Sequence, residues 1–227
     1  MGDVIARLVP GSVATAEVFG DPAGLSLHPA EQACIAGAVA SRRAEFRTGR
    51  YCARTALACL GAAPTAILRG PSGEPLWPAG VIGSITHCAG YRAAAVAHDT
   101  DLAGIGIDAE RNAPLAADMV ELISLPRERV MLASLAAVRP DVAWDRLLFS
   151  AKESVYKACF PLTGETLGFR SADVTFDAAG GSLAARLVAP ASVTSEQVHR
   201  LTGRFAVRHG IVLAVVVRDL ARHSGAA

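Results

Sequence analysis

The chain has 227 residues, of which 52% are hydrophobic and 19% are charged, so it is long enough for one large domain or two small ones and can bury a substantial core. Its formal net charge of +1 argues against a protein-wide electrostatic attraction to nucleic acid or to an anionic membrane. Any binding that depends on charge must therefore come from local patches.

The cysteines and the hydrophobic runs indicate the compartment. The five cysteines are odd in number and include no C-x-x-C pair, which favours reduced thiols over a disulfide framework or a zinc site. The amino terminus lacks a basic run followed by an apolar core, and "GIVLAVVV" is far shorter than the roughly 20 residues that a membrane span needs. We expect a cytoplasmic protein without membrane association.

The first half of the chain predicts helix followed by strands. Residues 29–60 have no internal proline and are predicted to form one or two helices, and residues 61–80 are rich in Gly and Pro and read as loop. Residues 81–87 and 92–99 are predicted to be paired strands around the turn "CAGY". Residues 102–110 are predicted to be a third strand.

The second half repeats this order. Residues 116–138 are predicted to be helical with a break at Pro126, and residues 144–160 to be a further helix. A hairpin is indicated at "DAAGGS" within residues 172–188, and a weaker one at "RHG" within residues 203–217. The order predicts an α+β protein with two halves joined near residues 100–104, although no strong repeat is evident residue by residue.

Both lysines of the chain lie in "FSAKESVYKACF", residues 149–160, and the other 20 of the 22 basic residues are arginine. At 100° per residue, Lys152 projects from the middle of an arc about 140° wide that contains apolar residues. That arc consists of Leu148, Phe149, Val155, Tyr156, Cys159 and Phe160. Charges at the border of a core need a partner, and phosphate or a metal ion would serve. The alternative is a snorkelling lysine beside a surface Glu153–Lys157 pair.

The segment "GIGIDAE" places two carboxylates on one side of a predicted strand. Asp108 and Glu110 project to the same face, with Cα atoms roughly 6.5 Å apart, while Ile105 and Ile107 point to the other face. Oxygen ligands of this kind suit Mg²⁺ or Mn²⁺. The alternative is a polar strand end. A dinucleotide fingerprint is rejected, because position 109 is alanine and no helix follows.

Arginine and histidine supply candidate anion contacts. Four arginines with helical spacing form one stripe, with Arg42 on its flank, and Arg69 lies in the following loop; the stripe is Arg43, Arg47, Arg50 and Arg54. Guanidinium groups bind phosphate through paired donors, but a solvated arginine face is an equally good interpretation. His87 lies at a strand end, where a lone histidine is usually structural.

Three segments together resemble the 4′-phosphopantetheinyl transferases. "GSITHCAGYRAAAVA", "GIGIDAE" and "LLFSAKESVYKACFPLTG" have the order and spacing of the monomeric Sfp-type enzymes, and the upstream "GEPLWP" and "RRAEFRTGRYCARTAL" are similar to the actinobacterial branch. The resemblance covers roughly residues 20–217. It implies a pseudo-dimeric α+β fold with two similar halves, residues 1–102 and 103–227, and an active site between them.

The resemblance also implies roles for the carboxylates and lysines. Asp108, Glu110 and Glu153 would coordinate Mg²⁺, with Mn²⁺ as an alternative, and the metal would also bind the pyrophosphate of coenzyme A. Lys157 would contact the pyrophosphate and assist the leaving group. Asp108, Glu153 and Lys157 would thus be the catalytic residues, with Glu153 as the base for the incoming serine, directly or through water.

Further residues would hold coenzyme A. The resemblance implies that Arg42 and Arg50 grip its 3′-phosphate. Other contacts to its phosphates and adenosine end would come from Arg69, Thr86, His87 and Lys152. Thr86 keeps the hydroxyl of the serine that many relatives have at this place, whereas Arg69 replaces a common lysine with a cation of different geometry.

The implied reaction transfers 4′-phosphopantetheine from coenzyme A to a serine of an acyl or peptidyl carrier protein and releases adenosine 3′,5′-bisphosphate. Fatty acid, polyketide and nonribosomal peptide synthesis all use such carriers. One alternative is a degenerate relative that binds coenzyme A or carrier without transfer, against which the full set of acidic and lysine residues speaks. The other is a nucleic-acid-binding module, which the near-neutral charge and the lack of an aromatic stacking motif disfavour.

Overall fold

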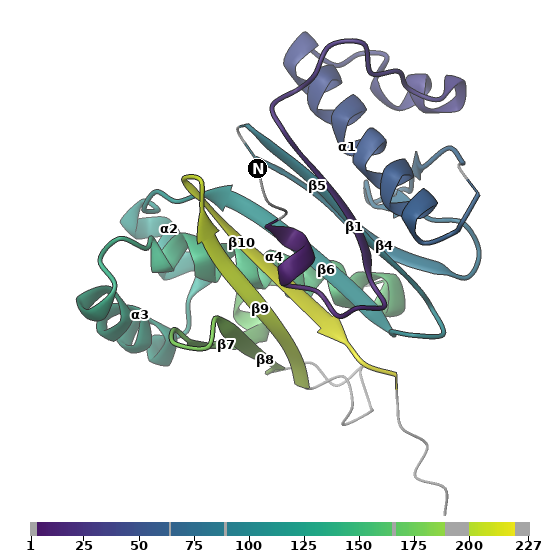
Figure 1. Cartoon of the computed structure of the whole chain (residues 1–227). Coiled ribbons are helices and arrows are strands. Elements are labelled where there is room, and N and C mark those ends of the chain that lie inside the picture. Colours follow the sequence, from purple (N-terminus) through teal and green to yellow (C-terminus); the bar gives the residue numbers. More distant parts are fainter. Residues whose placement is uncertain (1–3, 64, 89, 165–166, 189–199, 221–227) are drawn as a thin grey trace, which may run out of the picture.

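Two antiparallel sheets divide the chain between them (Figure 1). The structure is a computed structural model that describes residues 4–63, 65–88, 90–164, 167–188 and 200–220. The N-terminal sheet has the order β1 (Ala14–Phe19), β5 (Tyr91–His98), β4 (Val81–Cys88). The C-terminal sheet has the order β6 (Gly104–Arg111), β10 (Ile211–Arg218), β9 (Arg200–Arg208), β8 (Ser182–Leu187), β7 (Ala172–Asp177). A small hairpin of β2 (Leu68–Arg69) and β3 (Pro75–Leu76) precedes β4.

One long helix covers each sheet. The helix α1 (Ala40–Cys59) packs on the N-terminal sheet and α4 (Trp144–Thr163) packs on β6 and β10 (Figure 1). The shorter helices are α2 (Ala117–Ile123), α3 (Pro126–Val138) and the 3-10 turns η1 (Ile5–Arg7), η2 (Pro29–Ile35) and η3 (Phe169–Ser171). No helix in the described ranges is both long and apolar enough to cross a bilayer. The α+β architecture expected from the sequence is confirmed.

The hydrophobic core has a central part that joins the two sheets. Val4 and Ile5, at the start of η1, lie there with Ala93 of β5, Ile107 of β6 and Leu213 of β10, all at most 4% exposed. Separate clusters lie under α1 and under α4. Because Ile105 and Ile107 fill the central core, the alternate residues of β6 face α4, as the strand pattern of "GIGIDAE" predicts.

The sheets meet where β4 runs beside β6. The hydroxyl of Ser84 accepts a hydrogen bond from the Ile107 amide at 3.1 Å, and the hydroxyl of Thr86 accepts one from the Ala109 amide at 2.9 Å. Side-chain oxygens of β4 thus satisfy backbone donors of a strand in the other sheet. We call this junction the β4–β6 seam.

Several local predictions are confirmed and others needed the structure. Pro126 begins α3, where its missing N–H costs nothing, and both predicted hairpins of the C-terminal half are present. The turn between β9 and β10 has positive φ at His209 and Gly210, as a two-residue hairpin requires. The helix α4 continues past Pro161 to a left-handed cap at Gly164, and β1 was not predicted. The turn "CAGY" includes Ala89, which lies outside the described residues.

A buried glutamate organises the start of the N-terminal half. Glu31 is fully buried, and its Oε2 accepts hydrogen bonds from the amide of His28 at 3.0 Å and from Arg54 of α1 at 2.6 Å. Its Oε1 accepts one from the amide of Ile67 at 3.0 Å. One carboxylate therefore links the turn η2, the long helix and the segment entering β2.

The C-terminal half contains the same device. Glu128, 1% exposed, accepts hydrogen bonds at Oε2 from the Leu125 amide at 2.7 Å and from Lys152 of α4 at 2.7 Å, and at Oε1 from the Val174 amide at 2.8 Å. "HPAE" and "LPRE" are thus equivalent segments, although the sequence showed no strong repeat. The N-terminal sheet ends at His98 and the C-terminal sheet begins at Gly104, so we propose residues 1–102 and 103–227 as the two halves.

Gly106 should be essential for packing, because α4 lies directly against the backbone of β6 there. A Cβ atom at Gly106 would stand 1.9 Å from the carbonyl oxygen of Ser154 and 2.8 Å from the amide nitrogen of Ala158. We expect Gly106→Ala to lower the free energy of unfolding by about 3 kcal/mol or more, since neither contact is with a movable side chain. Urea denaturation measures it. Gly37→Ala, with open space around its Cβ, is the control, and equal stability of the two variants would contradict this packing.

Candidate active site at the junction of the two sheets

An ion pair between β6 and α4 forms the centre of the site. Lys157 Nζ donates to Asp108 Oδ1 at 2.8 Å and to the carbonyl oxygen of Ile107 at 3.1 Å. Thr86 of β4 lies 3.4 Å from the same Oδ1. The other oxygen, Asp108 Oδ2, is buried and has no hydrogen-bond partner among the described residues. A buried acceptor of this kind is costly unless something else binds it.

Two further carboxylates surround this ion pair. Burial raises the pKa of Glu110, the charge of Asp108 raises it further, and Arg146 at 3.3 Å opposes the shift. Burial also raises the pKa of Glu153; Lys157 lowers it in part and Asp108 adds to the rise. The three carboxylates therefore feel one another's charge, and a cation between them would relieve their repulsion.

The donor set is suited to a hard metal ion, although the side chains do not enclose one as they stand. In the described ranges, no group of three or more His, Cys, Asp or Glu side chains is arranged to hold a metal. The unpartnered Asp108 Oδ2 and the purely carboxylate donors nevertheless fit Mg²⁺, which binds oxygen and usually keeps several waters. Asp108, Glu110 and Glu153 thus remain the candidate ligands.

A cavity of about 750 Å³ opens beside Lys157. Its walls are the hairpin residues 71–77, residues 81–85 of β4, and Tyr156, Phe160 and Pro161 of α4. Trp77 is fixed by a hydrogen bond from its indole N–H to the carbonyl oxygen of Gly83 at 2.9 Å, and a Cβ at Gly83 would stand 2.7 Å from the indole ring. Sequence reasoning missed this cavity; the glycine opposite a tryptophan in "GEPLWPAGVIG" was its only local signal.

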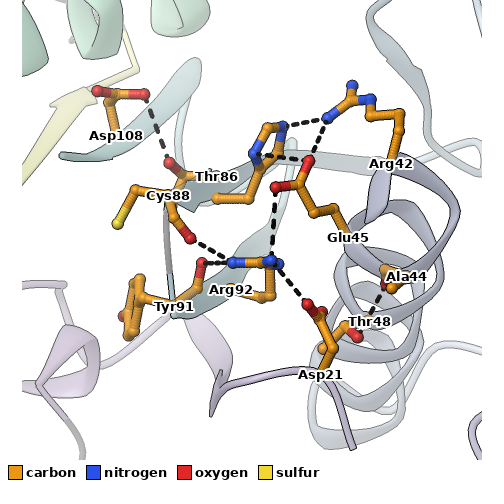
Figure 2. A network of polar contacts seen from close by, with 11 residues as sticks. Asp21, Arg42, Ala44, Glu45, Thr48, Thr86, Cys88, Tyr91, Arg92 and Asp108 are labelled. Carbon is orange, nitrogen blue, oxygen red and sulfur yellow. Dashed lines mark hydrogen bonds and ion pairs between the residues drawn. The ribbon is translucent and has the colours of Figure 1, made fainter. Parts of the chain in front are cut away.

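A polar network lies at the end of β4 that carries Thr86 (Figure 2). Arg42 Nη1 lies 2.7 Å from His87 Nε2 and 3.2 Å from Glu45 Oε2. Glu45 Oε1 is 3.5 Å from the buried Arg92, which pairs with Asp21 at 2.8 Å. Partial burial lowers the pKa of His87, and the charge of Arg42 lowers it further. The structure thus brings Arg42 and His87 together, and it adds three residues that the sequence did not single out.

Arg50 is bound to the protein's own backbone. Its Nε donates to the carbonyl oxygen of Ile67 at 2.7 Å, its guanidinium lies 4.3 Å from the centre of the Phe46 ring, and burial lowers its pKa to about 10. Arg43 and Arg54 of the same stripe also donate to backbone carbonyls. These contacts favour a structural role for Arg50 over the expected grip on a phosphate.

Arg69 and Thr86 differ in their accessibility. Arg69 is exposed on β2 at the rim of the hairpin, so its guanidinium can reach a ligand. Thr86 is 1% exposed, and its hydroxyl is engaged by the Ala109 amide and Asp108. The structure thus places Thr86 in the β4–β6 seam, where it orients Asp108.

Lys152 lies inside the protein. Its ammonium donates to Glu128 at 2.7 Å, to the carbonyl oxygen of Ile123 at 2.8 Å and to that of Phe169 at 2.9 Å, which uses all three of its N–H groups. Burial lowers the pKa of Lys152, and Glu128 opposes that shift. The helical pattern placed Lys152 correctly on the core side, but its partner is a carboxylate of α3, so we leave it out of the proposed phosphate site.

Comparison with known families agrees with the motifs. Residues 30–97 match the 4′-phosphopantetheinyl transferase N-terminal domain, and residues 104–216 match the 4′-phosphopantetheinyl transferase superfamily. Together the two matches cover both long helices, nearly all strands of the two sheets except β1, and every sequence-predicted site residue.

Named relatives match over nearly the whole chain. The 4′-phosphopantetheinyl transferase Svp of Streptomyces mobaraensis is 48% identical over 218 residues, which cover 94% of this chain and 88% of Svp. The 4′-phosphopantetheinyl transferase PptT of Mycobacterium tuberculosis is 44% identical, with 96% and 99% covered. Enterobactin synthase component D of Salmonella typhimurium is 39% identical over 136 residues, 59% of this chain and 55% of that protein. The resemblance to the actinobacterial branch is confirmed.

Replacing Lys152 should reduce stability without affecting the binding of coenzyme A. Lys152→Met leaves Glu128 buried without a cation, so we expect a loss of roughly 3–5 kcal/mol in the free energy of unfolding. Arg54→Met is the matched variant, because it removes the cation that pairs with the buried Glu31 in the other half. It should also destabilise the protein. Thermal melts with and without coenzyme A measure both effects. A Lys152→Met protein of normal stability that no longer gains stability from coenzyme A would contradict the interior role.

Proposed function

The chain belongs to the 4′-phosphopantetheinyl transferase superfamily, and on this premise we propose that Asp108, Glu153 and Lys157 carry out its chemistry. The enzyme transfers 4′-phosphopantetheine from coenzyme A to a serine hydroxyl of a carrier protein and releases adenosine 3′,5′-bisphosphate. The observation that carries the assignment of residues is the Asp108–Lys157 pair, with its unpartnered Oδ2, beside a cavity of about 750 Å³.

Asp108, Glu110 and Glu153 would hold a divalent cation, for which Mg²⁺ is the natural choice and Mn²⁺ an alternative. When bound, such an ion neutralises negative charge on the pyrophosphate of coenzyme A. The raised pKa values of Glu110 and Glu153 support this assignment. Burial and the charge of Asp108 disfavour the ionised form of both side chains, and a bound cation would stabilise that form.

Lys157 would act on the leaving group. Its side chain is 26% exposed and lines the cavity, and its ammonium already pairs with the carboxylate of Asp108. Beside the pyrophosphate it would donate to the oxygen that leaves with adenosine 3′,5′-bisphosphate as the bond to the pantetheine phosphorus breaks. A compact ammonium suits this role because it can approach closely and can release a proton.

Glu153 is the candidate base. Its raised pKa makes the ionised carboxylate a better proton acceptor than an ordinary glutamate. It would take the proton of the carrier serine, directly or through a water molecule, as the serine oxygen bonds to phosphorus. Asp108 forms an ion pair with Lys157. It would thus hold in place the ammonium group that faces the leaving group.

The remaining parts of coenzyme A would occupy both halves. The predominantly apolar cavity beside Trp77 and Phe160 suits the pantetheine arm. Arg42, His87 and the exposed Arg69 would bind the 3′-phosphate and the adenosine end. Since one chain supplies cations from the first half and carboxylates from the second, we propose that the enzyme works as a monomer. Its five free cysteines support a cytoplasmic location.

A nucleic-acid-binding role receives no support from the arginine stripe. Three of its four members, Arg43, Arg50 and Arg54, donate to oxygens of the protein itself. A guanidinium held in this way is less available to a phosphate backbone than a free one. The remaining alternative, that the protein binds coenzyme A without transferring phosphopantetheine, is tested by the following experiment.

Mass spectrometry of an apo carrier protein tests the function directly. With coenzyme A, Mg²⁺ and the enzyme, we expect the mass of the carrier to increase by one phosphopantetheine on its serine. A chelator should stop the reaction and excess Mg²⁺ should restore it. Binding of coenzyme A without a mass increase would identify a degenerate relative. A mass increase that persists in chelator would refute the metal site alone.

Lys157→Arg separates catalysis from charge. Arginine keeps the positive charge but holds its protons and replaces a point charge by a planar fork, so we expect kcat to fall about 100-fold while the Kd of coenzyme A changes little. Turnover on an apo carrier protein and calorimetric titration of coenzyme A measure the two quantities. Wild-type turnover in Lys157→Arg would reduce this residue to a charge partner of Asp108.

A further inference from the structure

A buried arginine anchors the polar network at the end of β4 (Figure 2). The side chain of Arg92 is 4% exposed. It donates to the carbonyl oxygens of Cys88 and Tyr91 and to Asp21 Oδ2, the last two at 2.8 Å. A desolvated guanidinium held by oxygens of three residues has little freedom to reorient. Arg92 is therefore a fixed point within this network.

Glu45 of α1 connects that fixed point to two accessible groups. Its Oε1 lies 3.5 Å from Arg92 Nη2, while its Oε2 lies 3.2 Å from Arg42 Nη1 and 3.8 Å from His87 Nδ1. The side chains of Arg42 and His87 are 43% and 40% exposed, so a ligand can reach both. Figure 2 shows the Glu45 carboxylate between Arg92 on one side and Arg42 on the other.

The contact between Arg42 and His87 fixes the protonation of the imidazole. A guanidinium only donates, so His87 Nε2, 2.7 Å from Arg42 Nη1, must accept. The ring is then neutral with its proton on Nδ1, the nitrogen that faces Glu45. Partial burial and the charges of Arg42, Lys157 and Arg92 lower the pKa of His87 and so favour this form, while Glu45 opposes them.

The arrangement leaves part of Arg42 available. Only Nη1 is used by Glu45 and His87, and within the described ranges Nη2 and Nε of Arg42 make no hydrogen bond. Two N–H groups with a fixed direction are what a phosphate oxygen pair requires. A flexible arginine would have to lose its side-chain freedom on binding, whereas one held in advance has already lost it.

We propose that Glu45 is a positioning residue that holds Arg42 and His87 as one preorganised anion-binding pair and thereby sets the preference for a ligand with a 3′-phosphate. The inference rests on the proposed function, in which Arg42 and His87 bind that phosphate. Glu45 itself does not touch the ligand; it acts through the two residues that it holds.

The test compares coenzyme A with 3′-dephospho-coenzyme A. The preference, defined as the ratio of kcat/KM for the two substrates, is measured for wild type, Glu45→Ala, Glu45→Gln, Arg42→Ala and Asp21→Asn. Asp21→Asn is the matched control. Like Glu45, Asp21 pairs with Arg92, so the variant also removes one negative charge beside that arginine, but Asp21 does not contact Arg42 or His87 in the structure. Thermal melts establish that each variant is folded.

We expect Glu45→Ala to lower the preference about tenfold through a higher KM for coenzyme A, with kcat and the KM of the dephospho compound nearly unchanged. Glu45→Gln should retain most of the preference, because its amide oxygen can still accept from Arg42. Asp21→Asn should retain it as well. In the free protein, ¹⁵N NMR should find the His87 proton on Nδ1 in wild type and a mixture of tautomers in Glu45→Ala.

Each other outcome overturns a distinct statement. An unchanged preference in Glu45→Ala, or tighter binding of coenzyme A by that variant, refutes the positioning role of Glu45. If Arg42→Ala still loses the preference, the assignment of the phosphate site stands. Equal losses in Glu45→Ala and Asp21→Asn would mean that the whole network around Arg92 matters and not the contact of Glu45 with Arg42 and His87. An unchanged preference in Arg42→Ala refutes the phosphate assignment and the inference with it.

Discussion

Two hydroxyl groups hold the halves of this enzyme in register. The hydroxyls of Ser84 and Thr86 of β4 accept hydrogen bonds from the amides of Ile107 and Ala109 of β6. The seam between the sheets therefore depends on two β4 side chains that both point toward β6. Because the hydrogen bonds fix β6 against β4, they also fix Asp108, which Thr86 touches, relative to the neighbouring His87. Together with the central core, this junction sets the distance between the cations of the first half and the carboxylates of the second half.

Local sequence patterns predicted the helices and strands. They could not predict which residues pair with the buried charged side chains. The alternation in "GIGIDAE" and the turn residues of "DAAGGS" are features of neighbouring residues, and both predictions are confirmed. The arc of α4 predicted that Lys152 faces the core, but its acceptors Glu128 and Ile123 lie on other helices, more than 20 residues away in the chain. β1 was missed although its residues alternate: Ala14, Ala16 and Val18 pack on the cluster under α1, but alanine gives only a weak hydrophobic signal.

The two lysines survive in an arginine-rich chain for different physical reasons. Lys152 meets three oxygens around one nitrogen, a geometry that an ammonium satisfies and a planar guanidinium does not. Its counterpart Arg54 meets Glu31 and the carbonyl of Ser26 through separate nitrogens, which suits the fork of arginine. Lys157 stands between a backbone carbonyl and Asp108 at the edge of the cavity, where it is accessible and compact.

The repeat of the glutamate anchor shows which parts of the two halves are equivalent and which are not. Glu31 and Glu128 each bind a turn amide, a helix cation and the amide of a residue in or next to a strand, with the same pattern of oxygens. Both halves therefore attach their long helix in the same way. At the seam the halves differ: the first presents Arg42 and His87, and the second presents Asp108, Glu110 and Glu153. A phosphate ester needs cations around its oxygens, and proton transfer needs a carboxylate beside it. Two similar halves that carry opposite charges at their common edge would supply both, as the proposed roles require, with Lys157 at the cavity.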